Sequence, residues 1–196
     1  MPNWCMNYLT VDGEEVEVEK FVNQIPRDRD GLGEDLFQKF VSIGNYNRDL
    51  AIDKWGTKWD VDEIDMSSWD SRIGRHDDGH TYSFYANLQT AWSPPVEAFT
   101  RISAKFPNLD FGLVWYETGM CFYGYCFMKA SEVLARLDGE LPDFNQLAEE
   151  KLDPRNSPYL GDQDVEEEAS QMEYKFIEDL EDQLSNIIAS NKGVTV

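Results

Sequence analysis

Alternation of apolar and polar residues marks the strands of this chain. Residues 3–11 and 81–91 alternate with a period of two, which is typical of strands whose two faces meet different surroundings. Two apolar runs follow at 109–117 and 120–128, and Thr118-Gly119 between them predicts a tight hairpin. A weaker strand-like run extends over 55–65. The pattern therefore predicts five strands.

Two helices are predicted between these strands. Asp12, followed three residues later by Glu15, is typical of a helix start, and the apolar stripe behind it ends at Pro26. Ser93 as N-cap and Pro94 at the first helical position begin a second helix, which runs to about residue 106. Residues 26–50 are predicted to be a loop that carries one helical turn.

The order strand, helix, strand, strand, helix, strand, with one added terminal strand, predicts an α+β fold. This is the order of a ferredoxin-like split βαβ sandwich, an antiparallel sheet with two helices. We place that domain at residues 1–130. Beyond Lys129, apolar residues are scattered among acids, and Pro154 and Pro158 are typical of a linker. Residues 131–196 are therefore predicted to be an acidic helical extension.

A long amphipathic helix is predicted at the end of this extension. It begins at Asp164, where Glu167 completes a capping box. Its apolar stripe consists of Met172, Phe176, Leu180, Leu184, Ile187 and Ile188. Such a stripe must be buried. It packs either on the parent domain or on a second copy of the chain, which would make a homo-oligomer through residues 172–188.

The net charge constrains the possible functions more than any sequence motif does. The 196 residues hold 17 Lys and Arg against 38 Asp and Glu, a formal net charge of −21. This balance disfavours direct binding of nucleic acid or of an anionic membrane, and it favours a basic protein partner. Four tyrosines are candidates for stacking RNA bases, but core packing explains them better because the cations that hold phosphates are too few. They are Tyr8, Tyr85, Tyr123 and Tyr125.

The cysteines and the first residues indicate where the protein works. Cys5, Cys121 and Cys126 form no C-x-x-C pair and are odd in number, so we expect reduced thiols within apolar strands. The first residues lack the basic and apolar regions of a signal peptide, and no apolar stretch is long enough to span a bilayer. We therefore expect a cytoplasmic protein.

Catalytic and metal-binding patterns are not found in the sequence. His76 and His80 lie in one Gly-containing turn without a third ligand at the required spacing. The acidic or amide runs at 60–70 and 45–49 lack the glycine of a calcium loop. No nucleophile elbow, P-loop or dinucleotide-binding glycine pattern is present. We expect no enzyme activity, no cofactor and no metal.

Four short segments carry a resemblance to a known family. They are Pro2-Asn3-Trp4-Cys5-Met6-Asn7, Trp55-Gly56-Thr57-Lys58-Trp59-Asp60, Thr90-Ala91-Trp92-Ser93-Pro94-Pro95 and Tyr116-Glu117-Thr118-Gly119. With them the chain resembles the YubB-like ferredoxin-fold domain of phages and plasmids over roughly residues 1–130. The resemblance implies a mobile-element accessory protein without established catalytic residues.

The leading functional hypothesis combines this resemblance with the charge. It is a non-enzymatic phage- or plasmid-type inhibitor that binds a basic surface of a host defence or nucleic-acid-processing protein, with carboxylates that imitate DNA phosphates. The partner-binding acids are predicted to be Glu166, Glu167, Glu168, Glu173, Glu178, Asp179, Glu181 and Asp182.

Two alternatives stay open at this point. The first is a module that sequesters a small molecule or nucleotide in a pocket formed by Trp55, Trp59, Tyr85 and Trp92. The second is a homo-oligomeric structural protein that needs only the apolar stripe of the last helix.

Overall fold

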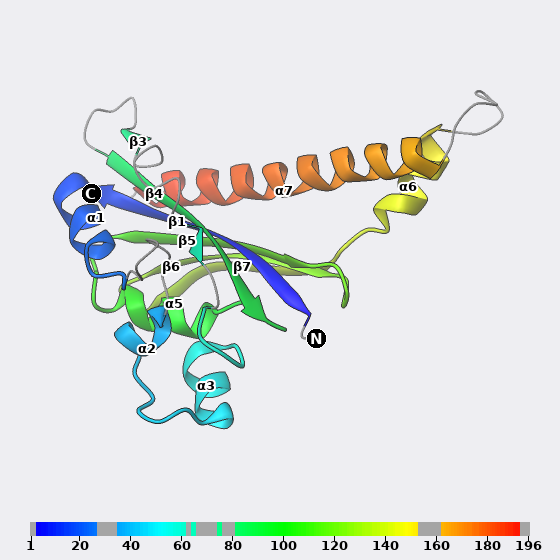
Figure 1. Ribbon diagram of the computed structural model, residues 1–196. Helices are drawn as coiled ribbons and strands as arrows, with labels where there is room; N and C mark the ends of the chain where they lie inside the picture. The colour runs from blue at the N-terminus through cyan, green and yellow to red at the C-terminus, as the bar shows by residue number, and fades with distance from the viewer. Residues whose placement is uncertain are drawn as a thin grey trace.

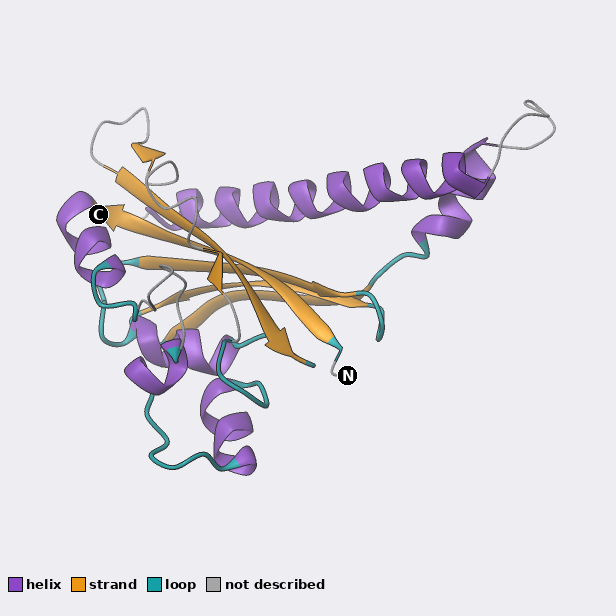
Figure 2. Cartoon of the chain, viewed as in Figure 1, coloured by secondary structure: helices purple, strands orange, loops and turns teal. Residues whose placement is uncertain are grey.

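Five long antiparallel strands form the centre of the computed structural model, which describes residues 3–26, 35–61, 64–65, 74–75, 81–152 and 162–192. Side by side they run β4-β1-β5-β6-β7 (Figure 2). Two short strands, β2 and β3, also pair with β4. The strands are β1 (Trp4–Glu14), β2 (Ile64–Asp65), β3 (Gly74–Arg75), β4 (Thr81–Ala91), β5 (Asp110–Glu117), β6 (Phe122–Lys129) and β7 (Glu132–Glu140).

Among the described residues, four helices cover one face of this sheet (Figure 1): α1 (Glu15–Val22), α2 (Leu36–Phe40), α3 (Arg48–Trp55) and α5 (Val96–Ser103). The core between helices and sheet is built largely from phenylalanines. Phe21 on α1 makes edge contacts with Phe106 and Phe111, at 5.3 and 5.4 Å between ring centroids. Burial of these rings supplies the main stabilisation of this layer, and the edge-to-face geometry adds to it.

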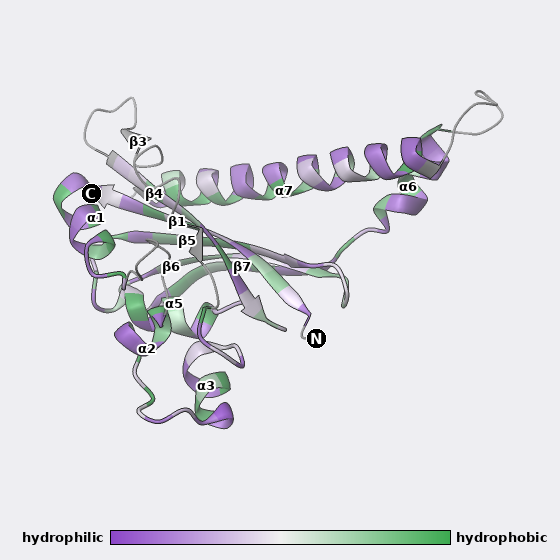
Figure 3. Ribbon diagram, viewed as in Figure 1, coloured by the Kyte–Doolittle hydropathy of each residue, from purple (hydrophilic) through white to green (hydrophobic). Residues whose placement is uncertain are grey.

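The opposite face of the sheet is partly covered by the long helix α7 (Asp162–Lys192), which the shorter α6 (Phe144–Leu152) precedes. In Figure 3, hydrophobic residues recur along α7, which is otherwise mostly hydrophilic. Leu180, Leu184 and Ile188 are buried against Val114 on β5 and Phe127 on β6. The apolar stripe of α7 is therefore buried within the chain, on its own sheet.

A glycine allows α7 to approach the sheet closely. At Gly112 on β5, an added Cβ would lie 3.0 Å from Leu184 Cδ2 and 3.1 Å from Ile188 Cδ1. A larger residue there would have to displace the helix or distort its side chains.

The segment around residue 55 differs from its predicted strand. Residues 48–55 form α3, and within 55–65 only Ile64–Asp65 is a strand among the described residues. The Asn47 side chain caps α3 by accepting a hydrogen bond from the Leu50 N–H at 3.0 Å. The sequence prediction was wrong here because a local cap and tertiary packing outweighed the strand propensity of the tryptophans.

Helix boundaries also shift from their predicted positions. β1 continues to Glu14, so α1 begins later than Asp12, whose carboxylate instead accepts a hydrogen bond from the Ser83 hydroxyl. α5 begins at Val96, and the Ser93 hydroxyl donates to Gly56 O at 2.6 Å instead of capping the helix. Both side chains form hydrogen bonds with residues distant in sequence instead of capping the helix next to them.

Residues 131–196 are not helical throughout. They begin with β7, which pairs with β6 from Lys129↔Glu132 to Phe122↔Glu140. In the second half of β7 charged residues alternate with Ala135 and Leu137, which pack toward α7, whereas Val133 and Leu134 are exposed, so no continuous apolar run marks the strand. The predicted boundary at residue 130 thus falls between two neighbouring strands.

Within the described residues, no helix is both long enough and apolar enough to cross a membrane.

Candidate functional site

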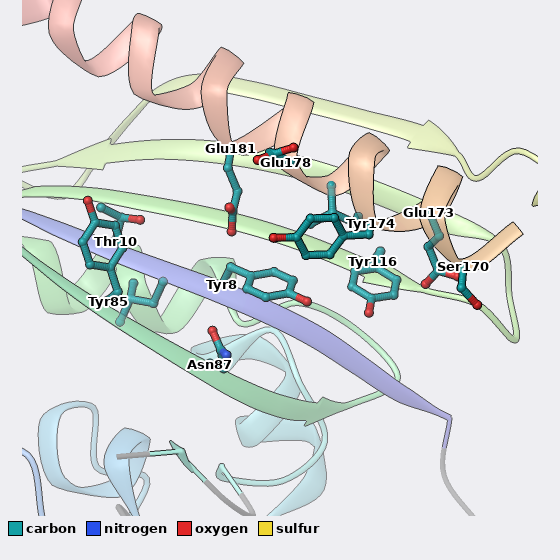
Figure 4. A pocket seen from close by; sticks show the side chains of 12 residues that line it. Tyr8, Thr10, Tyr85, Asn87, Tyr116, Ser170, Glu173, Tyr174, Glu178 and Glu181 are labelled. Atoms are coloured by element: carbon teal, nitrogen blue, oxygen red, sulfur yellow. The ribbon is translucent and has the colours of Figure 1, made fainter. Parts of the chain in front are cut away.

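A cavity of about 680 Å³ lies between α7 and strands β1, β4 and β5 (Figure 4). We call it the tyrosine–glutamate groove. Its lining is polar and acidic, with tyrosines from both the sheet and the helix. The lining residues are Tyr8, Leu9, Thr10, Tyr85, Asn87, Tyr116, Ser170, Glu173, Tyr174, Ile177, Glu178 and Glu181.

The sheet contributes one wall of the groove through strand register. Tyr8 pairs with Asn87 and Thr10 with Tyr85, so the four side chains share the face toward α7. Because α7 packs on β5 and β6, it leaves this part of β1 and β4 uncovered. Tyr85 accordingly keeps 41% of its surface exposed. The groove therefore exists because one helix covers only part of a wide sheet.

The helix contributes the other wall through its periodicity. Positions 170, 173, 174, 177, 178 and 181 recur at intervals of three and four residues, which places them on one side of α7. In Figure 4, Glu173 and Glu181 point from α7 toward the strands. Tyr174 remains 73% exposed above the groove.

Two tyrosine rings form a stacked pair in the groove. Tyr8 and Tyr116 are 6.2 Å apart between centroids, with an interplanar angle of 11°. Burial raises the pKa of Tyr8, and the neighbouring Tyr116 and the charges of Glu181 and Glu173 raise it further. The phenol therefore stays neutral, and its ring presents a negative π face.

The carboxylate of Glu181 is electrostatically frustrated. Although part of the side chain is exposed, its carboxylate turns toward the sheet, where desolvation raises its pKa. The charges of Asp182 and Glu178 raise that pKa further. Glu181 and Asp182 also line an adjoining cavity of about 210 Å³. A cation in the groove would stabilise the ionised carboxylate and so oppose both causes.

The predicted partner-binding acids do not all line one cavity. Glu173, Glu178 and Glu181 line the groove, and Glu166 lines an adjoining cavity of about 510 Å³ beside α6, which shares Ser170 and Glu173 with the groove. The others differ again: Glu168 pairs with Lys151, Asp179 lies 3.7 Å from Lys175 Nζ, Glu167 is exposed, and Asp182 belongs to the adjoining cavity. The period of the α-helix places these eight acids on different sides of α7.

The predicted pocket of Trp55, Trp59, Tyr85 and Trp92 is not assembled. Trp55 is buried in the helix-side core, and its indole N–H donates to Val41 O at 2.8 Å. Tyr85 lies on the other face of the sheet, facing α7. Trp59 and Trp92 meet around Lys58, whose Nζ is 4.2 and 4.4 Å from their ring centroids. The set is divided because Tyr85 faces α7, whereas Trp55 lies in the core on the other side of the sheet.

Metal and thiol chemistry find no support in the described part of the chain. No group of three His, Cys, Asp or Glu side chains there is arranged to hold a metal ion. His76, His80, Asp62 and Asp70 lie outside the described residues. Asp60 accepts hydrogen bonds from the N–H groups of Phe37 and Gln38 at the start of α2, while burial raises its pKa.

The cysteines are free, and two of them are inert by burial. Burial raises the pKa of Cys5, and it raises that of Cys126 to about 12. Cys121 is exposed in the turn between β5 and β6, and so it is not within a strand as predicted.

Sequence reasoning named five residues of the groove, but it did not place them together. It did not propose Tyr116, which it named only in a family segment, or Tyr174 as site residues, and these two complete the aromatic lining. The shared spacing of residues 170–181 was visible, yet it was overshadowed by the apolar stripe of the same helix. Carboxylates beside tyrosine faces, with no Lys, Arg or His among the described lining residues, form an arrangement suited to a cation.

Comparisons with known proteins place the chain in a family. A family model described as a ferredoxin-like domain in Api92-like protein matches residues 68–178, more than half of the chain. The chain is also similar to the crystal structure of a protein api92 from Yersinia pseudotuberculosis. That match has 15% identity and a TM-score of 0.37, and it covers 54% of this chain and 39% of that chain. No curated protein matches.

The match confirms the α+β, ferredoxin-like fold class predicted from the sequence. The YubB-like resemblance is not confirmed. The matched region also begins at residue 68 and extends beyond residue 130 into α7, unlike the resemblance, which covered residues 1–130. The chain belongs to the family of ferredoxin-like domains of Api92-like proteins.

Proposed function

We propose that this protein is a non-enzymatic binding protein that takes up cationic side chains of a basic partner in the tyrosine–glutamate groove. The observation that carries the proposal is the lining of one cavity by three glutamates and four tyrosines without a basic residue among its described lining. Carboxylates give charge-assisted hydrogen bonds to Arg or Lys, and tyrosine faces attract the same cations.

The overall charge supports a protein partner. A net charge of −21 steers a basic surface toward the molecule, and the groove provides the place where that attraction becomes a specific contact. The partner we infer is a host defence or nucleic-acid-processing protein, which the phage- or plasmid-type protein inhibits in the bacterial cytoplasm. In that role the acids of α7 stand in for DNA phosphates.

A labelled basic peptide tests the groove directly. Fluorescein-labelled octa-arginine is titrated with the protein, and binding is followed by fluorescence anisotropy at low and high salt. Glu173→Gln/Glu181→Gln removes two groove charges, whereas Glu167→Gln/Asp179→Asn removes two α7 charges outside it. We expect the groove variant to bind roughly tenfold or more weakly, since each charged hydrogen bond contributes about 1.5–3 kcal/mol. The control variant should change affinity by less than about twofold.

Equal weakening by the two double variants would contradict the groove as the site, because it would mean that only net charge attracts the peptide. Unfolding in urea, measured on both variants, separates lost binding from lost structure.

A further inference from the structure

A second cavity, of about 630 Å³, lies on the opposite side of the sheet, between α5, the end of α2 and β7. We call it the basic cavity. Its lining mixes aliphatic side chains with cations. The lining residues are Phe40, Val41, Val96, Glu97, Thr100, Arg101, Ala104, Lys105, Ser131, Val133 and Arg136.

Three cations meet at this cavity, against one acid. Arg101 lies on α5, Lys105 in the turn that follows it, and Arg136 on β7, whereas Glu97 is the sole carboxylate among the described lining residues. Asp138 binds Arg136 beside the cavity, so the described charges leave an excess of one positive charge, in a chain with more than twice as many acids as bases. This local excess favours an anion.

Two of the cations are held in place yet keep free donors. The Nε and Nη2 groups of Arg136 donate hydrogen bonds to the Asp138 carboxylate at 2.7 and 3.0 Å. These bonds use two of the five N–H donors of the guanidinium. The Lys105 ammonium donates to Phe40 O and has further N–H groups. Prior fixing of the donors lowers the entropy lost when a ligand binds.

The aliphatic part of the lining restricts what the ligand is. Phe40 and Val96 are almost fully buried at its base, while Val133 on β7 is 44% exposed at its edge. Thr100, which also lines the cavity, has a buried hydroxyl oxygen without a hydrogen-bond partner among the described residues. A free inorganic anion would leave the aliphatic surface unused, and a long polyanion would meet the repulsion of the whole chain.

We propose that the basic cavity binds a small amphiphilic anion, with a carboxylate or phosphate head on an apolar body. The head lies among Arg101, Lys105 and Arg136, and the body lies on Val96 and Val133. This site is separate from the tyrosine–glutamate groove, and its occupancy does not depend on the function proposed for that groove.

Calorimetric titration of the full chain tests the proposal. The probes are sodium decanoate and decyl phosphate, both used below the concentration at which they form micelles. Inorganic phosphate supplies a head without a body, and decan-1-ol supplies the body without a charge. We expect both amphiphiles to bind, and each partial probe to bind at least tenfold more weakly. Stronger binding of decanoate than of decyl phosphate, or the reverse, identifies the preferred head.

Matched variants locate the site. Arg101→Gln/Lys105→Gln removes two cavity charges, and Lys20→Gln/Lys175→Gln removes two exposed charges elsewhere. The cavity variant should bind decanoate at least tenfold more weakly, and the control less than twofold. Arg101→Gln alone avoids the loss of the Lys105 bond to Phe40 and should still weaken binding severalfold. Absence of binding by the unmodified protein, or equal weakening by both double variants, would overturn the proposal.

Discussion

The tyrosine–glutamate groove and the basic cavity have nearly the same volume, about 680 and 630 Å³, on opposite faces of one sheet. The first is lined by three glutamates and no described cation, and the second by three cations and one glutamate. Net charge is a property of the whole chain, but the charge of a site depends on which side of which helix borders it. The net charge of −21 therefore has the same sign as the lining of the first cavity and the opposite sign to that of the second.

The two cavities also differ in what holds them open. The groove depends on α7, whose aliphatic side chains pack on Val114, Phe127 and tyrosines of β5 and β6. The basic cavity is formed by α5 and β7, which belong to the body of the domain, and Ser131 N–H donates to the Ser103 hydroxyl oxygen at 3.0 Å between them. Loss of α7 should therefore remove one site and leave the other.

The largest expected effect comes from loosening α7. Leu184 is 3% exposed, so Leu184→Ala should lower the free energy of unfolding by about 2–5 kcal/mol through lost burial and a new cavity. Peptide binding in the groove should weaken, while decanoate binding in the basic cavity should persist below the unfolding transition. Urea denaturation and the two titrations measure this. Leu147→Ala, at a residue 41% exposed on α6, is the control and should change stability by less than about 0.5 kcal/mol.

If Leu184→Ala abolished both binding activities in the folded protein, the two cavities would not be independent sites.

A smaller effect is expected from the exposed aromatic edge of the groove. Tyr174→Ala removes a ring that is 73% exposed, and an exposed cation–π contact contributes roughly 0.5–1 kcal/mol. Octa-arginine should therefore bind roughly two- to fivefold more weakly by anisotropy, with unchanged stability. Tyr46→Ala, at an exposed tyrosine beside α3, serves as the matched substitution. A comparable loss in both variants would argue against a role for the tyrosine face of the groove.

The smallest expected effect concerns Glu181, whose ionised carboxylate lowers the stability of the folded protein. Its folded-state pKa is raised by desolvation and then by Asp182 and Glu178, while Tyr8 and Tyr85 face it from the strands. Between the unfolded and folded pKa the folded protein binds more protons, so this group lowers stability as pH rises through that window. Glu181→Gln should therefore stabilise the unliganded protein at pH 7, by no more than about 0.5 kcal/mol because water screens the exposed side chain.

Urea unfolding curves at several pH values measure this difference. It should vanish below the ordinary pKa of a glutamate, where the native carboxyl is protonated in both states. If Glu181→Gln were less stable than the native protein at pH 7, the inferred destabilisation by the Glu181 carboxylate would be wrong.

The strands that a local pattern specifies were predicted well. β4 coincides with residues 81–91, and the hairpin of β5 and β6 was found, although its turn includes Cys121. A period of two in the apolar residues directly reflects the burial of one face of a strand. β7 was missed because its place at the edge of the sheet leaves most of its side chains in water, so its sequence has no continuous apolar signal.

The groove shows the limit of the same reasoning. The acids of α7 and the tyrosines of β1 and β4 were each candidates, but they lie more than 80 residues apart in sequence. Their meeting depends on where α7 crosses the sheet, and therefore on contacts such as Leu184 against Gly112. The predicted tryptophan pocket failed for the same reason, since Trp55 and Tyr85 lie on opposite faces.

The sequence by itself determined the fold class, the amphipathic character of α7 and the dominance of acids, because each is written in local periodicity or in composition. The tertiary structure decided which acids face a tyrosine and which face water, and it gathered Arg101, Lys105 and Arg136 from α5, the turn after it and β7 into one cavity. The physical reason is that a site is a property of distances between side chains. Those distances are fixed by strand register and by helix docking, which depend on packing across the whole domain.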